Sequence, residues 1–185
     1  GCGVLVGALP DVPDREGIAA RARKLIEDGF EVDGVHCEYD LAEGNHFLDV
    51  CETLGGVGGV VPGSPAYFVM HSSGHEHRKT SPWGAGIYVD ESESLRARTR
   101  TFDTPWGTLT VALGDDAAWF FDVYSKVQRF NHKRREAIAT ALFGDAWRVV
   151  VNATHQGLSA VNDAHLGCYV FDDADVARGA VFPLT

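Results

Sequence analysis

The chain has 185 residues and a formal net charge of −10 at pH 7, and 45% of its residues are hydrophobic while 23% are charged. This composition is typical of a globular protein and excludes a disordered chain, and the acidic balance excludes a protein that coats nucleic acid through broad phosphate neutralisation. No apolar stretch is long enough to span a bilayer, so we expect no contact with a membrane. The length predicts a single domain over residues 1–185.

Apolar runs and local start signals predict the elements of the first half of the chain. The run at residues 3–9 is typical of a buried strand, and the segment from Asp11 to Asp14 is typical of a helix start. The glycine-rich stretch 55–59 lacks the lysine of a phosphate-binding loop, so we expect a turn there rather than a nucleotide site. In chain order the predicted elements are a strand at 3–9, a helix at 13–28 that stops at Gly29, extended chain at 30–40, a strand at 43–52, the turn, and a strand at 67–70 that leads to His71. In the strand at 43–52, His46, Leu48 and Val50 share a face.

The second half of the chain contains the longest predicted helix. Asp115 and Asp116 suit the positive N-terminus of a helix, and the stripe that follows is apolar except at Arg134. The predicted elements are a loop-like region at 80–106 with a short strand at 86–89, a strand at 109–113, the long helix at 115–143, a strand at 147–154 that leads to His155, and strands at 168–171 and 179–184. Together they predict an α+β fold with a central layered sheet of mixed strands, one medium helix and one long helix.

One cysteine and three histidines stand at the ends or polar edges of predicted strands. A thiolate and three imidazoles form a complete ligand set for zinc, manganese, iron or cobalt. No pair has the short spacing of a zinc finger, and strand-end histidines satisfied by ordinary hydrogen bonds are the alternative explanation. The four positions are Cys2, His46, His71 and His155.

Four short segments carry a family resemblance: Gly1-Cys2-Gly3, Gly44-Asn-His-Phe47, His71-Ser-Ser73 and Thr154-His-Gln156. In their order and flanking residues they resemble the RtcB family of RNA-splicing ligases. That family carries D-x-G-C-G, then G-N-H-F followed by an acidic residue, then H-S-G-S-R-G, then a histidine usually followed by asparagine. The helix around Asn131-His132 and the segment 169–183 are also similar to that family, so the resemblance covers nearly the whole chain and implies an RtcB-like fold.

The resemblance implies roles for individual residues. Asn45 and Gln156 would contact a nucleotide, and Asp49 would orient a ligand imidazole through its second ring nitrogen. Manganese is the implied metal, with zinc, iron or cobalt as alternatives. Its implied ligands are the same four residues that the strand ends single out: Cys2, His46, His71 and His155.

The chain also departs from the family pattern. The arginine of H-S-G-S-R-G is missing, since the sequence reads His71-Ser-Ser-Gly-His75, and Gln156 stands where asparagine is usual. The family's aspartate two residues before the glycine-cysteine pair would lie ahead of Gly1, and the H-G-A-G-R segment whose histidine accepts guanylate does not occur in these 185 residues. Covalent guanylate transfer therefore has no acceptor, and we do not expect GTP-dependent ligation from these residues alone.

We expect instead a metalloenzyme that acts on an RNA end or on a phosphate-containing small molecule. Asp49, His75 and His77 are its candidates for proton transfer, although loop histidines are commonly just solvated. Two alternatives stay open: the sequence is part of a complete GTP- and manganese-dependent ligase, or it is a non-catalytic binding module that works with a partner chain. The 4 cysteines lie far apart without a C-x-x-C pair, which predicts a reducing compartment and a cytoplasmic protein.

Overall fold

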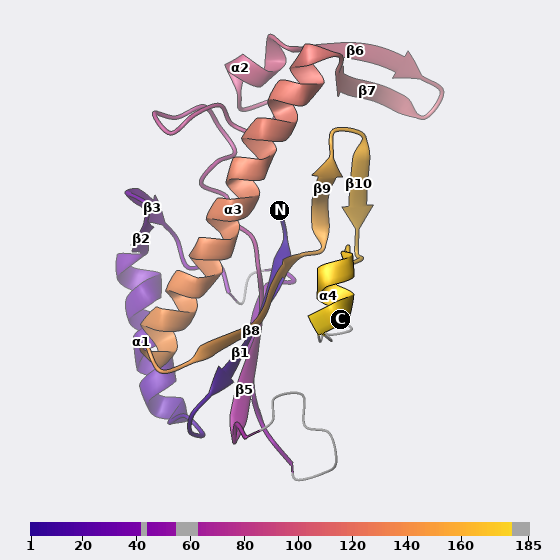
Figure 1. The fold of residues 1–185 in the computed structure, drawn as a ribbon. Helices are drawn as coiled ribbons and strands as arrows, with labels where there is room; N and C mark the ends of the chain where they lie inside the picture. The colour runs from indigo at the N-terminus through magenta and orange to yellow at the C-terminus, as the bar shows by residue number, and fades with distance from the viewer. Residues whose placement is uncertain (42–43, 55–62, 179–185) are drawn as a thin grey trace.

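A four-stranded antiparallel sheet forms the centre of the protein, with the strand order β4-β5-β1-β8 (Figure 1). The structure is a computed structural model, and it describes residues 1–41, 44–54 and 63–178. The sheet consists of β1 (Gly3–Leu9), β4 (Phe47–Glu52), β5 (Ala66–Ser72) and β8 (Arg148–Thr154).

Two helices cover one face of this sheet. The first, α1 (Arg15–Asp28), begins at Asp14, whose carboxylate accepts the backbone N–H groups of Glu16 and Gly17. The second, α3 (Asp115–Phe143), runs across the sheet and extends well beyond it (Figure 1). Alternate residues of the strands and the inner faces of the helices form one buried core, made of Leu5, Leu9, Leu25, Leu41, Ala66, Phe68, Met70, Ile138, Ala139 and Leu142.

The middle of β1 needs a glycine because an aromatic ring lies directly over it. A Cβ atom on Gly7 would approach the Phe68 ring to 2.2 Å. That ring stacks on Phe143 with 4.7 Å between centroids and meets the Trp147 ring edge-on at 5.5 Å. The pairing of β1 with β8 also shifts register at this point, between Val6 and Gly7. Aromatic packing therefore compensates for the missing side chain.

Smaller elements surround the central sheet. In the described ranges the additional strands form ribbons of two: β2 (Phe30–Val32) with β3 (Val35–Cys37), β6 (Thr99–Thr104) with β7 (Gly107–Ala112), and β9 (Gln156–Ala160) with β10 (Asp163–Leu166). The β6–β7 ribbon lies by the N-terminal end of α3 and points away from the sheet (Figure 1). The short helices are α2 (Glu93–Arg96) and α4 (Asp173–Arg178). None of the helices in the described part of the chain combines the length and apolar character needed to cross a bilayer.

The α+β class is confirmed, as are the strand at 3–9, the helix that stops at Gly29 and the helix at 115–143. The prediction of mixed strands is wrong, because every described pairing in the central sheet is antiparallel. The reason is the path of β5, which returns antiparallel to β4 and lies between β4 and β1. The predicted turn at 55–59 and strand at 179–184 fall outside the described residues.

Two predicted strands are absent from their predicted positions. Residues 86–89 are irregular because the N–H groups of Ile87 and Tyr88 donate to the carbonyls of His77 and Arg78, in a loop rather than a sheet. Residues 168–171 are also irregular, and the strand of that region, β10, lies earlier in the chain. In addition, β4 begins at Phe47, so His46 precedes the strand, and His71 lies inside β5 rather than after it.

Candidate metal centre

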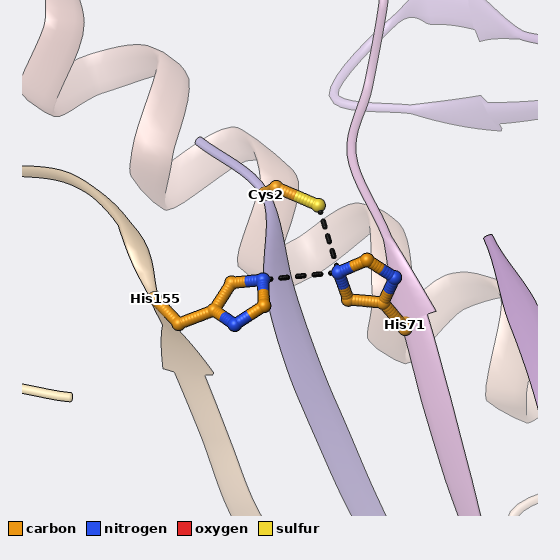
Figure 2. Close-up of side chains that lie close together, drawn as sticks. All are labelled: Cys2, His71 and His155. Atoms are coloured by element: carbon orange, nitrogen blue, oxygen red, sulfur yellow. Dashed lines mark hydrogen bonds between the residues drawn. The ribbon is translucent and has the colours of Figure 1, made fainter. Parts of the chain in front are cut away.

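The antiparallel order of the sheet brings three chain segments together at one edge. Because β1 runs opposite to both β5 and β8, its first residues lie beside the last residues of those strands, with Val4 opposite His71 and Gly3 opposite Thr154. The carbonyl of Cys2 accepts the N–H groups of His155 at 3.1 Å and of Gln156 at 3.2 Å. The side chains of Cys2, just before β1, His71, within β5, and His155, just after β8, therefore converge (Figure 2).

The ligand atoms of these three residues lie close together. His71 Nε2 is 3.0 Å from Cys2 Sγ and 2.9 Å from His155 Nε2, and all three atoms are within 4.8 Å of one another. Two ligand atoms of a tetrahedral zinc site are about 3.3–3.6 Å apart, as follows from Zn–N and Zn–S bond lengths. The thiol and two imidazoles thus have the chemistry and the approximate spacing to hold a transition-metal ion. All three residues are buried, with at most 9% of their surface exposed.

The backbone fixes which nitrogen of His71 faces this cluster. His71 Nδ1 lies 2.7 Å from the carbonyl oxygen of Asn45, which requires the proton to be on Nδ1. The lone pair of Nε2 then points toward Cys2 and His155, which is the arrangement that a metal ligand needs. The Asn45 backbone therefore orients His71, whereas the predicted nucleotide contact of the Asn45 side chain stays a prediction.

His46 adds a third imidazole at the margin of the cluster. Its Nε2 lies 3.9 Å from Cys2 Sγ and 3.4 Å from the Ser73 hydroxyl. Its Nδ1 forms an ion pair with Asp40 at 2.6 Å, and both side chains are at least nine-tenths buried. The hydrogen bond to Asp40, and then the one to Cys2, raises the pKa of His46 to about 9, so the metal-free imidazole is protonated at neutral pH.

Asp40 connects His46 to the long helix. Burial by itself would raise the pKa of the Asp40 carboxyl, but the hydrogen bond from His46 and the charge of Arg134 outweigh burial and lower it. Arg134 donates to Asp40 at 2.8 Å and to Glu76 at 2.9 Å, and its side chain is only 1% exposed. A carboxylate on the second nitrogen of a ligand histidine fixes the ring and strengthens its basicity. Asp40 occupies this position beside His46.

A second arginine lies behind the cluster. Arg135 is fully buried, donating to Asn152 Oδ1 at 2.9 Å and to the Ser72 carbonyl at 3.2 Å. Its Nη2 has no hydrogen-bond partner among the described residues, and a Cβ atom on Gly3 would lie 2.9 Å from it. Burial lowers the pKa of Arg135 to about 10, while the neighbouring Cys2 opposes that shift. The guanidinium remains charged at neutral pH and lies beside Cys2.

The other predicted site residues lie at different distances from the cluster. His75 is exposed and stacks on His46 with 6.2 Å between centroids. His77 points elsewhere, with its ring edge-on to Phe130 at 4.4 Å, and burial lowers its pKa. Asp49 is exposed on β4. Gln156 is exposed and contributes its backbone, since its carbonyl accepts the Tyr124 hydroxyl at 3.2 Å.

Sequence reasoning missed Asp40, Ser73 and the roles of Arg134 and Arg135. An arginine interrupting the apolar stripe of a long helix was a usable signal, because a buried cation needs a partner. For Asp40 the sequence offers no signal, since its contact with Arg134 spans 94 positions. Comparisons with protein-family models, with curated proteins and with solved structures find no match to this chain.

Proposed function

We propose that the chain binds one divalent transition-metal ion and uses it on a phosphate ester, in the manner implied by its resemblance to the RtcB family. The observation that carries the proposal is the convergence of Cys2, His71 and His155, whose ligand atoms all lie within 4.8 Å of one another. His46 completes the proposed ligand set. The bound ion would supply a Lewis acid that polarises a phosphoryl oxygen or activates water.

The surrounding residues have defined tasks in this proposal. Asp40 holds His46 through Nδ1 and leaves Nε2 directed at the cluster. Arg135 places a buried positive charge beside Cys2, which would offset part of the negative charge of a thiolate ligand. His75, stacked on His46 and open to solvent, is placed to exchange protons between the site and water. We retain Asp49 and His77 only as alternative proton-transfer groups, since Asp49 is exposed on β4 and His77 packs on Phe130.

Two arguments about the identity of the metal lead to different ions. The family resemblance implies manganese, whereas a thiolate beside imidazoles is a softer ligand set that suits zinc, iron or cobalt. Elemental analysis of protein purified from medium containing all four metals tests both. We expect about one tightly bound ion per chain in the wild type and a strong loss in Cys2→Ser and His71→Ala.

Matched controls separate this site from adventitious binding. Cys51→Ser and His36→Ala change the same residue types outside the cluster, and they should retain the metal. Equal loss of metal in the controls, or no metal in the wild type, would overturn the proposed site.

The chemistry is tested separately. RNA with a 2′,3′-cyclic phosphate end should be opened by the metal-loaded protein, and radiolabelled GTP should leave no covalent guanylate on the chain.

The same geometry supports a second candidate function, nucleophilic catalysis by Cys2 in the metal-free chain. The thiol lies 3.0 Å from His71 Nε2. Asp40 orients His46 in the way that the carboxylate of a cysteine–histidine–carboxylate triad orients the histidine. A reactive thiolate would be alkylated rapidly by iodoacetamide, and bound metal would protect it. Rapid Cys2 alkylation combined with a wild type that binds no metal favours this function over the metal centre.

A further inference from the structure

A cavity of about 470 Å³ lies along α3, apart from the candidate metal centre. It is bounded by the turn between β2 and β3, by the loop that carries Trp83 and by the N-terminal half of α3. None of the four proposed metal ligands lines it. Its volume falls within the range of small-molecule sites, so its lining residues decide what it can bind.

The floor of the cavity is apolar and buried. Val127 and Phe130 on α3 are 6% and 7% exposed, and both line the cavity. The His77 ring meets Phe130 edge-on at 4.4 Å, and burial lowers the pKa of His77, so the ring is neutral at pH 7. The floor therefore offers a flat ligand an uncharged and closely packed contact surface.

Two indoles form part of the walls. Trp83 is 58% exposed although it is a large apolar side chain. Its ring lies over Gly34, where a Cβ atom would approach Cη2 to 3.0 Å and the φ angle is +76°. Glycine at position 34 therefore allows both the positive φ angle of the turn and the close approach of the Trp83 ring. Trp119 is held by the Arg98 guanidinium, 4.5 Å from its ring centroid.

Three cations border the same cavity. Lys126, Arg129 and Lys133 follow each other at helical spacing on α3, and all three are exposed. The single acidic residue of the lining, Asp33, forms an ion pair with Lys133 at 2.7 Å. Lys126 and Arg129 have no ion-pair partner in the part of the chain that the structure describes. On a chain with a net charge of −10, this is a localised positive site.

We propose that this cavity binds a nucleoside phosphate, with the base against Trp83 and the phosphate at Lys126 and Arg129. The exposed indole of Trp83 provides a stacking surface for a base, and the unpaired cations provide the charge that a phosphate requires. Neither part suffices alone, since a lone phosphate makes no use of the indoles and an apolar ligand makes no use of the cations. The bound unit is either a free nucleotide or one nucleotide of a single-stranded RNA.

Calorimetric titrations test the proposal with probes that separate the two halves of the ligand. Wild-type protein in EDTA is titrated with AMP, adenosine, ribose 5-phosphate and a short single-stranded oligoadenylate. We expect AMP to bind more tightly than adenosine and ribose 5-phosphate. Oligoadenylate binding tighter than AMP identifies RNA as the source, and equal or weaker binding identifies the free nucleotide. Absence of binding by both AMP and oligoadenylate, or equal affinity for AMP and adenosine, overturns the proposal.

Variants locate the binding within the molecule. Trp83→Ala and the double variant Lys126→Glu/Arg129→Glu should each weaken binding by about tenfold or more. The controls are Trp106→Ala, which removes an indole that is 94% exposed on the β6–β7 ribbon, and Arg23→Glu/Lys24→Glu, which makes the same charge change on α1. Equal losses in these controls contradict the site.

Binding at this cavity is independent of the proposed metal chemistry, and one further variant separates the two. Folded Cys2→Ser protein should bind AMP as the wild type does, because Cys2 does not line the cavity. If Cys2→Ser abolishes AMP binding while the Trp83 variant retains it, the nucleotide binds at the metal centre and the cavity proposal is wrong. If Cys2→Ser loses metal and keeps AMP binding, the two sites are distinct.

Discussion

The Asp40 carboxylate contacts His46 Nδ1 at 2.6 Å with one oxygen and Arg134 Nη1 at 2.8 Å with the other. Replacing Asp40 by asparagine keeps the shape and removes the charge that fixes His46 and supports its basicity. We expect Asp40→Asn to weaken metal binding by about 10- to 100-fold, the range measured for such supporting carboxylates. Competition against a chromophoric chelator measures this affinity directly.

Asp49→Asn is the control for that experiment. The family resemblance implies that Asp49 supports a ligand histidine, whereas Asp49 is exposed on the edge strand β4. We expect its substitution to leave metal affinity unchanged. The opposite result, a large effect at Asp49 and none at Asp40, would show that the residue implied by the resemblance is the one that acts.

His132 provides a prediction for the pH dependence of stability. Its Nε2 lies 3.0 Å from the Thr154 hydroxyl, and burial, followed by the charge of Arg135, lowers its pKa from 6.5 to about 4. Between these values the unfolded chain binds a proton that the folded chain does not, so stability falls as the pH drops from 6.5 toward 4. Urea unfolding of the wild type and His132→Gln in EDTA measures this contribution. The stability lost between pH 7 and pH 5 should be smaller in the variant, and equal losses would contradict the assignment.

At the scale of elements, α3 is held to the rest of the fold by a buried cation. Arg134 is 1% exposed and pairs with Asp40 and Glu76. Arg134→Met removes the cation shared by two buried carboxylates and leaves Asp40 with His46 alone, and we expect it to lower the free energy of unfolding by about 3–5 kcal/mol. The adjacent Lys133→Met removes the exposed pair with Asp33 and should cost at most about 1 kcal/mol. Chemical denaturation of the two variants compares them, and similar losses would mean that Arg134 is not a structural anchor.

The sequence predicted those elements whose local signals agree with their packing. The strand at 3–9 is apolar throughout and is buried on both faces, and the helix at 115–143 has a clear stripe. The prediction of strand at 168–171 was wrong although Tyr169, Val170 and Phe171 favour strands, because strand propensity depends on the tertiary context, which composition does not show. The β6 strand was missed since all its residues but Phe102 are polar and its four central residues are exposed, so no alternation marks it.

At the scale of the whole molecule, the candidate site depends on contacts that no local pattern contains. Cys2, His71 and His155 were identified because each adjoins an apolar run, and the sheet does bring them together. Asp40 and the orientation of His71 by a backbone carbonyl follow only from tertiary structure. The sequence could therefore predict which residue types meet, but not which groups orient them.

A metal ion at this position would join β1, β5 and β8, because its ligands are the residue before β1, a residue within β5 and the residue after β8. An ion that binds only the folded chain stabilises it, by about 2.7 kcal/mol at a free concentration a hundredfold above the dissociation constant. For a chain of this size that corresponds to a rise in Tm of about 5–10 °C.

We expect EDTA to lower the Tm of the wild type by this amount in differential scanning calorimetry, and a saturating metal ion to restore it. Cys2→Ser should show the lower Tm with or without EDTA, whereas Cys51→Ser should respond as the wild type does. A wild-type Tm that does not change with EDTA, in protein shown to carry the ion, would mean that the metal is held without joining these three strands.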